Sequence, residues 1–148
     1  MINSLLRGCH ILLLACMSAG VVAGEGSAAV KLTVSNIQSD VGKLYIAVYD
    51  SKDTFLGDTK VYEQVVGLDN LKDGQVDVEL TLPFGAYAIS VHHDSNANGK
   101  MDRNFIGIPK EPVGLSNGHV PKFGPPKFSK ALIEISQPQQ QELIALIN

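Results

Sequence analysis

Cysteine is nearly absent from this sequence of 148 residues, and its two copies, Cys9 and Cys16, both lie close to the amino terminus. A chain that loses its first residues on export keeps no thiol, so a disulfide framework is excluded. Stability must then come from a hydrophobic core. About 120 residues in one domain can bury enough apolar surface for such a core.

Tryptophan is missing, and the basic residues are fewer than the acidic ones, with a formal net charge of −3. An acidic balance without a basic cluster is unlike a nucleic-acid-binding surface, so we expect no nucleic-acid partner. The lack of tryptophan also weakens the argument for a platform on which sugars stack, although four tyrosines remain.

Long apolar runs are missing as well, except near the amino terminus. Arg7 precedes an apolar run that begins Ile11-Leu12-Leu13-Leu14, and Val21-Val22-Ala23 offers a small-x-small cleavage pattern. These features predict a signal peptide over residues 1–23, followed by a short linker over 24–29. The run is too short for a retained membrane span, so we expect no transmembrane span in the mature chain and an exported protein, periplasmic or secreted.

A second interpretation of the same segment stays open. Leu13-Leu14-Ala15-Cys16 resembles a bacterial lipobox, in which Cys16 is lipidated and becomes the new amino terminus. The protein would then be a lipid-anchored subunit of an envelope assembly. In the first interpretation Cys16 is an ordinary residue of the signal.

Apolar and polar residues alternate in four runs after the signal. Alternation with a period of two turns one set of side chains toward a core and the other toward solvent, which predicts half-buried strands. The core sides of these runs are Val30, Leu32 and Val34; Leu44, Ile46 and Val48; Val76, Val78, Leu80 and Leu82; and Tyr87, Ile89 and Val91.

Weaker patterns complete the expected fold. Residues 61–66 and 131–136 are strand candidates, and the terminal apolar run 142–147 is predicted as a strand. Gln137–Gln141 is interpreted as a polar connector, and residues 51–60 have room for one helical turn. Short strands at short spacing, without a long helical pattern, predict an all-β fold: a β-sandwich of about seven strands in a single domain over residues 30–148.

Residues 94–129 interrupt the alternating pattern with much glycine, proline and asparagine. A structureless segment of this length is uncommon in a compact domain unless it is functional or disordered. We expect one long ordered loop over 94–129, pinned onto the sandwich by its apolar residues. These are Phe105, Ile106, Ile108, Val113, Leu115, Phe123 and Phe128.

The most direct chemical signal lies at the start of that loop. Asp94, Asn96, Asn98 and Asp102 carry side-chain oxygens at the spacing that opens a calcium-binding loop, and Gly99 permits the sharp turn. Because alternate residues direct their oxygens inward, such a segment can wrap around a cation. The sequence therefore predicts a calcium site over residues 94–102.

The ligand set is incomplete. Lys100 would contribute its backbone carbonyl, but the position of the usual bidentate glutamate is occupied by Phe105. We therefore expect weak calcium binding, with a Kd on the order of 10⁻⁴ to 10⁻³ M, unless a remote carboxylate such as Glu111 completes the shell. The alternative stays open that the same residues form a rigid turn without metal, since Asp and Asn side chains bond nearby backbone amides.

Histidines give a weaker signal. His92 and His93 are adjacent on a strand and point to opposite faces, so a zinc or copper site would need His119 and one more ligand. We expect His93 to bond a backbone carbonyl instead. A nucleophilic triad of Ser95 or Ser116 with His93 and Asp94 has the right residue types, but the sequence has no nucleophile-elbow pattern.

Several short motifs occur in order between residues 83 and 128. They are Pro83-Phe84-Gly85-Ala86-Tyr87, Gly107-Ile108-Pro109-Lys110-Glu111-Pro112, Gly114-Leu115-Ser116-Asn117 and Gly124-Pro125-Pro126. In these motifs the chain resembles the DUF2141 family of exported bacterial proteins over about residues 30–136. The resemblance implies a small β-sandwich of immunoglobulin-like or prealbumin-like type behind a signal peptide. It supplies no reaction and no substrate.

The sequence as a whole predicts an exported binding or structural module of the bacterial envelope. Its expected cofactor is a weakly bound structural calcium ion at 94–102, and its partner is an envelope protein or ligand. The alternative is an envelope hydrolase that uses the same loop as the rim of its active site. An enzyme should have a deep pocket lined by His93, Asp94 or Glu111, whereas a module should have a filled core and a shallow loop surface.

Overall fold

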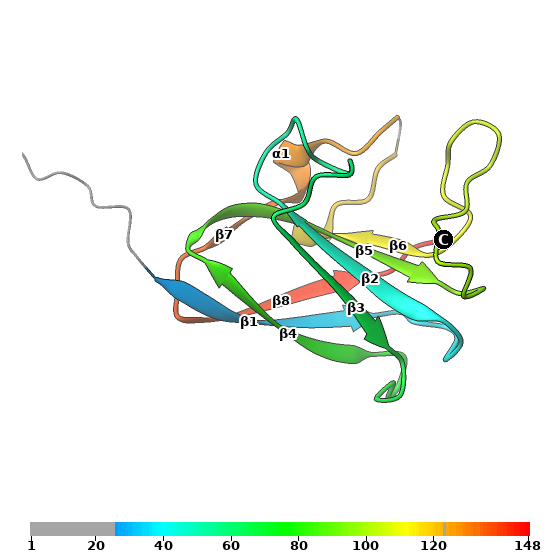
Figure 1. Ribbon diagram of the computed structural model, residues 1–148, viewed down its shortest axis with the longest axis horizontal. Coiled ribbons are helices and arrows are strands. Elements are labelled where there is room, and N and C mark those ends of the chain that lie inside the picture. Colours follow the sequence, from blue (N-terminus) through cyan, green and yellow to red (C-terminus); the bar gives the residue numbers. More distant parts are fainter. Residues whose placement is uncertain (1–25, 123) are drawn as a thin grey trace, which may run out of the picture.

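The computed structural model describes residues 26–122 and 124–148. In this part of the chain, eight strands form two sheets (Figure 1). One sheet has the order β4-β1-β8, and the other has the order β3-β2-β5-β6 with β7 beside β5. The strands are β1 (Ser27–Ser35), β2 (Lys43–Tyr49), β3 (Tyr62–Gly67), β4 (Val76–Pro83), β5 (Gly85–Asp94), β6 (Val113–Leu115), β7 (Leu132–Ile135) and β8 (Gln139–Ala145). The all-β prediction is confirmed.

Helical structure among the described residues is limited to the one-turn elements η1 (Ser116–Gly118) and α1 (Phe128–Ala131). None of it is long and apolar enough to cross a membrane. The predicted signal peptide over 1–23, with the lipobox cysteine Cys16, lies outside the described residues, as does Phe123.

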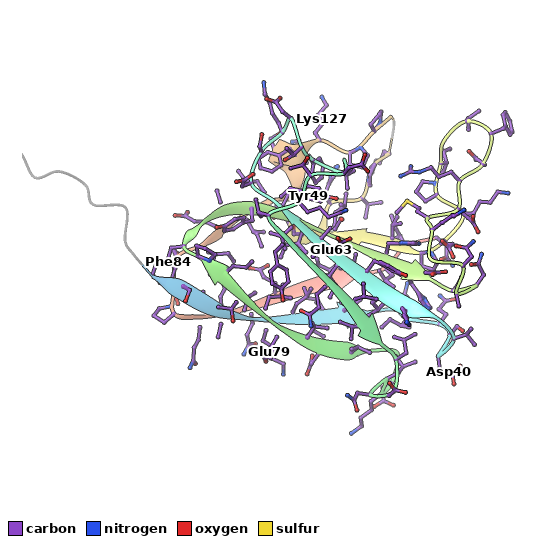
Figure 2. The ribbon with its side chains drawn as sticks, in the orientation of Figure 1. Asp40, Tyr49, Glu63, Glu79, Phe84 and Lys127 are labelled. Carbon is purple, nitrogen blue, oxygen red and sulfur yellow. The ribbon has the colours of Figure 1, made fainter. Side chains whose placement is uncertain are left out.

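Alternation along the strands explains the two-layer arrangement. On β4 every second side chain is buried, from Val76 to Leu82, while the residues between them face solvent. Figure 2 shows one of these, Glu79, directed away from the opposite sheet. The four runs of alternating residues become β1, β2, β4 and β5, because successive side chains of a strand point to opposite faces.

The core lies between the two sheets. Val30, Leu32 and Val34 of β1 pack in one apolar cluster with Leu44, Ile46 and Val48 of β2 and with Ile89 and Val91 of β5. All of these side chains are completely buried. The sheets therefore pack face to face, and the hydrophobic effect on these residues is the main stabilising contribution.

Two local predictions are wrong. The connector predicted over Gln137–Gln141 ends early, because Gln139 begins β8 and its backbone pairs in parallel with Ala29 on an open sheet edge that tolerates polar side chains. Residues 51–60 form turns and no helix. Leu56 has a φ of +60°, which interrupts a right-handed helix.

The segment 94–129 is not a single loop. Leu115 pairs with Ser90 and Val113 pairs with His92, so β6 returns to the sheet and divides the segment into loops 95–112 and 119–127. Gly114 makes this return possible: a Cβ there would lie 2.5 Å from Cγ2 of Ile144. Because that position lacks a side chain, β6 can lie close to β8.

The apolar residues of the segment have different roles. Phe128 packs with Phe55 against a small second cluster that contains Leu115 and Ala131, as an anchor should. Phe105, Ile106 and Ile108 are not anchors, since 98%, 64% and 54% of their surfaces are exposed. The prediction that they pin the loop to the sandwich is wrong, because polar contacts at the base of the loop hold it instead.

Candidate functional site: the loop from β5 to β6

Loop 95–112 leaves the sheet at the end of β5, where three polar residues in a row are buried. His92, His93 and Asp94 are 9%, 1% and 2% exposed. Lys43 of β2 pairs with Asp94, and just before it Gly42 has a φ of +90°. A Cβ on Gly42 would lie 1.8 Å from the carbonyl oxygen of Asp94, so only glycine allows β2 to begin at this distance from the loop.

The two histidines face opposite sides of the sheet, as the strand geometry predicts. Nε2 of His93 lies 2.8 Å from the carbonyl oxygen of Val41, which confirms the expected backbone contact. Within the described residues, the buried Nδ1 of His93 has no hydrogen-bond partner. His92 stacks on Tyr45, with ring centroids 5.6 Å apart. No group of three or more His, Cys, Asp or Glu side chains that could hold a metal ion occurs in residues 26–122 and 124–148.

Glu111 joins the two arms of the loop. Its side chain is buried, and Oε2 lies 2.7 Å from Nε2 of His92. The backbone N–H of Ser95 donates to Oε1 at 3.1 Å, and the N–H of Asp102 donates to Oε2 at 3.2 Å. One carboxylate thus connects the end of β5, the first residue of the loop and its middle.

The predicted calcium ligand Asp94 organises the first turn. The N–H groups of Asn98 and Gly99 donate to its Oδ1 and Oδ2 at 3.1 and 2.8 Å. The turn bends through Ala97 and Gly99, which have φ values of +59° and +76°. The Asp94 carboxylate therefore holds the first turn together. Asp94 occupies a position comparable to the first residue of a calcium-binding loop.

The other predicted side-chain ligands meet around Asp102. The side-chain amides of Asn96 and Asn98 donate to its Oδ2 at 2.6 and 2.9 Å. The side-chain oxygen of Asn96 accepts the N–H of Asn98, and that of Asn98 accepts the N–H of Lys100. The loop therefore brings four of the predicted residues together, and these bonds are those of the metal-free alternative. Within the described residues, Lys100 takes part in this turn through its backbone N–H, and no hydrogen bond to its carbonyl oxygen is found.

The loop ends in a compact tip. The N–H of Asn104 donates to the carbonyl oxygen of Ile108 at 2.8 Å, and the side-chain oxygen of Asn104 accepts the N–H groups of Ile106 and Ile108. The guanidinium of Arg103 donates to the carbonyl oxygen of Gly107. Phe105 and Ile106 are the central residues of the turn from Asn104 to Gly107, and Phe105 is almost entirely exposed.

Ser116, a candidate triad residue, has a structural role. It is completely buried, its hydroxyl accepts the N–H of Ile89 at 2.8 Å, and it donates to the carbonyl oxygen of Ala131. Both hydrogen-bonding directions of the hydroxyl are thus used within the fold.

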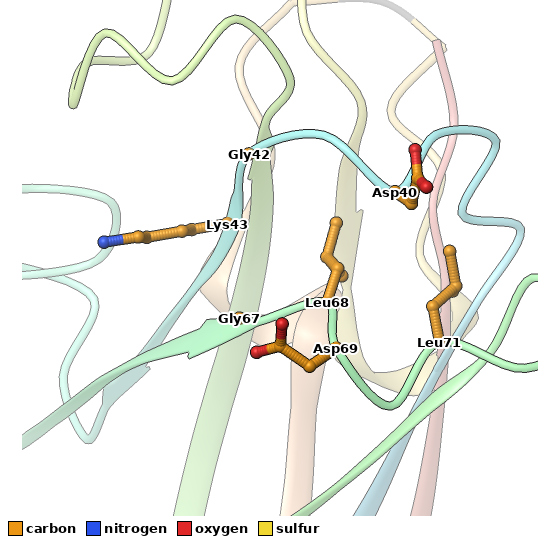
Figure 3. Close-up of a pocket in the computed structure, with 7 residues that line it drawn as sticks. All are labelled: Asp40, Gly42, Lys43, Gly67, Leu68, Asp69 and Leu71. Carbon is orange, nitrogen blue, oxygen red and sulfur yellow. The ribbon is translucent and has the colours of Figure 1, made fainter.

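Two hollows on the described surface are lined by residues other than His93, Asp94 and Glu111. The first, of about 580 Å³, lies between the β1–β2 connection and the end of β3 (Figure 3). Its lining residues are Asp40, Gly42, Lys43, Gly67, Leu68, Asp69 and Leu71. The second, of about 610 Å³, lies between residues 50–55 and 126–129. The candidate site described above is the surface of loop 95–112.

Sequence reasoning named Glu111 only as a remote carboxylate, and it missed the exposure of the tip. No sequence signal distinguishes Glu111 from other acidic residues, because the return path of the loop determines its partners. The tip has a local signal: Asn104 and Gly107 are turn formers that bracket two adjacent apolar residues.

A family model described as an uncharacterized protein conserved in bacteria (DUF2141) matches residues 32–142. Neither the curated proteins nor the solved structures give a match. The matched range includes the whole of loop 95–112 and reaches into β8.

Proposed function

The chain belongs to the DUF2141 family, and we propose that it is an exported binding module of the bacterial envelope that uses loop 95–112 as its contact element. The observation that carries this proposal is the contrast between the two ends of the loop. Its base contains the buried residues Asp94 and Glu111, while Phe105 at its tip is 98% exposed. Loops on rigid β scaffolds commonly carry binding, because the scaffold fixes their position.

Export is supported by the sequence features of residues 1–23. A soluble periplasmic or secreted form is the proposed mature protein, and attachment through a lipid on Cys16 is the alternative. The two are separated by mass spectrometry of the protein purified from cells that express the full chain. An amino terminus near residue 24 supports the soluble form, whereas a lipidated Cys16 contradicts it.

We also propose a weak structural calcium site formed by Asp94, Asn96, Asn98, the Lys100 carbonyl and Asp102. Its support is the convergence of the side chains of Asn96, Asn98 and Asp102, together with the bonds of Asp94 to the backbone of the same turn. A cation would compete with the hydrogen bonds that Asp102 accepts from the two asparagines. The ion would neutralise the two carboxylates and tie down the beginning of loop 95–112.

Isothermal titration calorimetry of the chelator-treated protein tests the calcium site. Heat with a Kd on the order of 10⁻⁴ to 10⁻³ M is expected. Asp102→Asn should abolish it, since it removes one charge and keeps the side-chain shape. The matched control is Asp58→Asn, which removes an exposed carboxylate outside the loop. Absence of heat at millimolar calcium would leave the hydrogen-bonded turn as the explanation of the motif.

Of the two fold types that the family resemblance implies, the prealbumin-like sandwich has the better support. In an immunoglobulin constant-type domain the first two strands share a sheet. Here β1 belongs to one sheet and β2 to the other, and β1 pairs with the last strand in parallel. We therefore infer a prealbumin-like arrangement.

Binding of the purified protein to washed envelope fractions tests the module as a whole. The protein should sediment with the envelope, and the double variant Phe105→Ser with Ile106→Ser should not. A matched control, Val61→Ser with Val65→Ser, removes two exposed apolar side chains at and beside β3. Equal sedimentation of the wild type and the loop variant would overturn the proposal.

A further inference from the structure

Three large apolar side chains are gathered at the tip of loop 95–112. Phe105, Ile106 and Ile108 are 98%, 64% and 54% exposed. Scattered apolar residues on a surface are ordinary, but a group on one projecting element marks an interaction site. In Figure 1 the loop extends well beyond the end of the sandwich.

Hydrogen bonds within the loop hold its tip in a defined conformation. The backbone carbonyl oxygen of Asp102 accepts the N–H of Lys110, and that of Ile108 accepts the N–H of Asn104, so the two arms of the loop pair like a hairpin. The side chain of Asn104 closes the turn through two further bonds. A pre-formed tip loses little conformational entropy when it binds.

The backbone of the tip is largely satisfied internally. The N–H groups of Asn104, Ile106, Gly107 and Ile108 all donate to oxygens within the loop. Dehydrating an unpaired backbone group is costly, so a segment that leaves water must pair its own polar groups. The tip meets this requirement at these four N–H groups, which lowers the cost of removing it from water. A protein partner has polar groups of its own and would not require this internal pairing.

The exposed charges around the tip are mainly positive. Lys100, Arg103 and Lys110 are exposed in the loop, whereas Glu111 is buried and Asp102 is engaged by Asn96 and Asn98. Over residues 94–112 these three basic side chains equal Asp94, Asp102 and Glu111 in number, so the positive character belongs to the exposed side chains and not to the net charge of the loop. Apolar side chains with basic neighbours are the composition of segments that lie at an anionic lipid surface.

We propose that the tip of loop 95–112 inserts Phe105, Ile106 and Ile108 into an anionic lipid bilayer, while Lys100, Arg103 and Lys110 contact its headgroups. This assignment rests on the proposed function, because it names the partner of the same loop. Phosphatidylglycerol and cardiolipin are lipids of the required charge. The insertion is peripheral, and the sandwich stays outside the bilayer.

The absence of tryptophan from the chain allows a clean test. Phe105→Trp places the sole indole at the tip, and the protein is mixed with vesicles of phosphatidylethanolamine and phosphatidylglycerol. The indole emission should shift to the blue and be quenched by brominated lipid. Val65→Trp, at a position that is 48% exposed on β3, is the matched control and should show neither effect.

Affinity measurements complete the test. Phe105→Ser with Ile106→Ser should weaken vesicle binding by about tenfold or more. Vesicles of phosphatidylcholine alone should bind far less, and added salt should weaken binding to the anionic vesicles. Absence of an emission shift on anionic vesicles, or equal binding to neutral ones, would overturn the proposal.

The outcomes separate this proposal from the function on which it rests. Sedimentation with envelope fractions but not with vesicles would overturn the lipid assignment and leave a binding module with a protein partner. Failure of both would overturn both. A dimer in analytical ultracentrifugation that the double serine variant abolishes would assign the tip to a second copy of the chain, and would overturn the lipid assignment as well.

Discussion

Nε2 of His92 lies 2.7 Å from Oε2 of Glu111, although the two residues are 19 positions apart in the sequence. Both side chains are buried, and the same carboxylate accepts the backbone N–H groups of Ser95 and Asp102. This contact fixes the base of loop 95–112. The loop projects from the sandwich because its two arms are fastened at this point.

Removal of the Glu111 carboxylate should destabilise the protein. Glu111→Ala leaves His92 and two backbone N–H groups without their acceptor, and unpaired buried donors are costly. We expect the free energy of unfolding to fall by about 2 to 4 kcal/mol in urea denaturation. Glu79→Ala, on the exposed face of β4, is the control and should change it by less than about 0.5 kcal/mol. Equal effects of the two changes would contradict the anchoring role.

Gly42 should be intolerant of any side chain. Gly42→Ala combines a positive φ with a Cβ located 1.8 Å from the Asp94 carbonyl oxygen, so β2 or the loop must move. We expect a loss of about 3 kcal/mol or more, or a failure to fold.

The matched control for that change is Gly107→Ala. Gly107 has a similar φ of +85°, but its Cβ would meet nothing within 4 Å. The expected loss is about 1 kcal/mol, which is the backbone contribution alone. Thermal and urea denaturation of both variants measure the difference, and similar losses would show that the close approach to Asp94 is unimportant.

Ser116→Ala should destabilise the fold without affecting binding to envelope fractions. The change leaves the buried N–H of Ile89 and the carbonyl oxygen of Ala131 without the hydroxyl that joins them. A loss of about 1 to 3 kcal/mol is expected from urea denaturation. The exposed Ser129→Ala is the control. If Ser116→Ala abolished a hydrolytic activity while leaving stability intact, the structural role would be refuted.

Lowering the pH should break the surface interaction of Asp77 on β4 with Thr33 and Lys31 on β1. The hydroxyl of Thr33 and the ammonium of Lys31 bond Asp77 at 2.7 and 2.9 Å, and they hold the pKa of this carboxyl below its ordinary value of 3.8. The unfolded chain therefore binds a proton more readily than the folded one. The contribution is complete above pH 3.8 and is lost as the pH falls through the lowered pKa.

Asp77→Asn should therefore lose less stability than the wild type when the pH is lowered through this window. The effect is small because the pair is exposed and screened by salt. Denaturation at a series of pH values measures it, with Asp58→Asn as the control. The prediction is contradicted if the free energy of unfolding falls more steeply with decreasing pH in Asp77→Asn than in the wild type.

The strands of this protein were largely predictable, whereas the environment of its loop was not. The sequence predicts β4 from the apolar residues at every second position, Val76, Val78, Leu80 and Leu82. Successive side chains of a strand point to opposite faces, so alternation in the sequence becomes one buried face and one exposed face. The oxygen-bearing residues at 94–102 predicted either a calcium site or a metal-free turn around Asp94, and the Asx bonds of such a turn are local. Such predictions need only neighbours a few positions away.

Phe105 and Phe128 mark the limit of that reasoning. They are the same residue type in the same segment, yet Phe128 packs beside Phe55 and Phe105 faces solvent. Composition cannot distinguish them, because burial depends on where the chain returns to the sheet. The return is made by β6, a strand of three residues that is too short to produce an alternating pattern.

The sequence by itself determined the all-β class, the main strands and the turn that begins at Asp94, since each depends on side-chain periodicity or on hydrogen bonds between near neighbours. Tertiary structure alone decided that Glu111 meets His92 and that Phe105 is exposed. Both depend on contacts between distant segments, which form only when the loop returns to the sheet at β6. The physical reason is that a strand pattern is a local property, whereas the partner of a buried carboxylate is chosen by the whole fold.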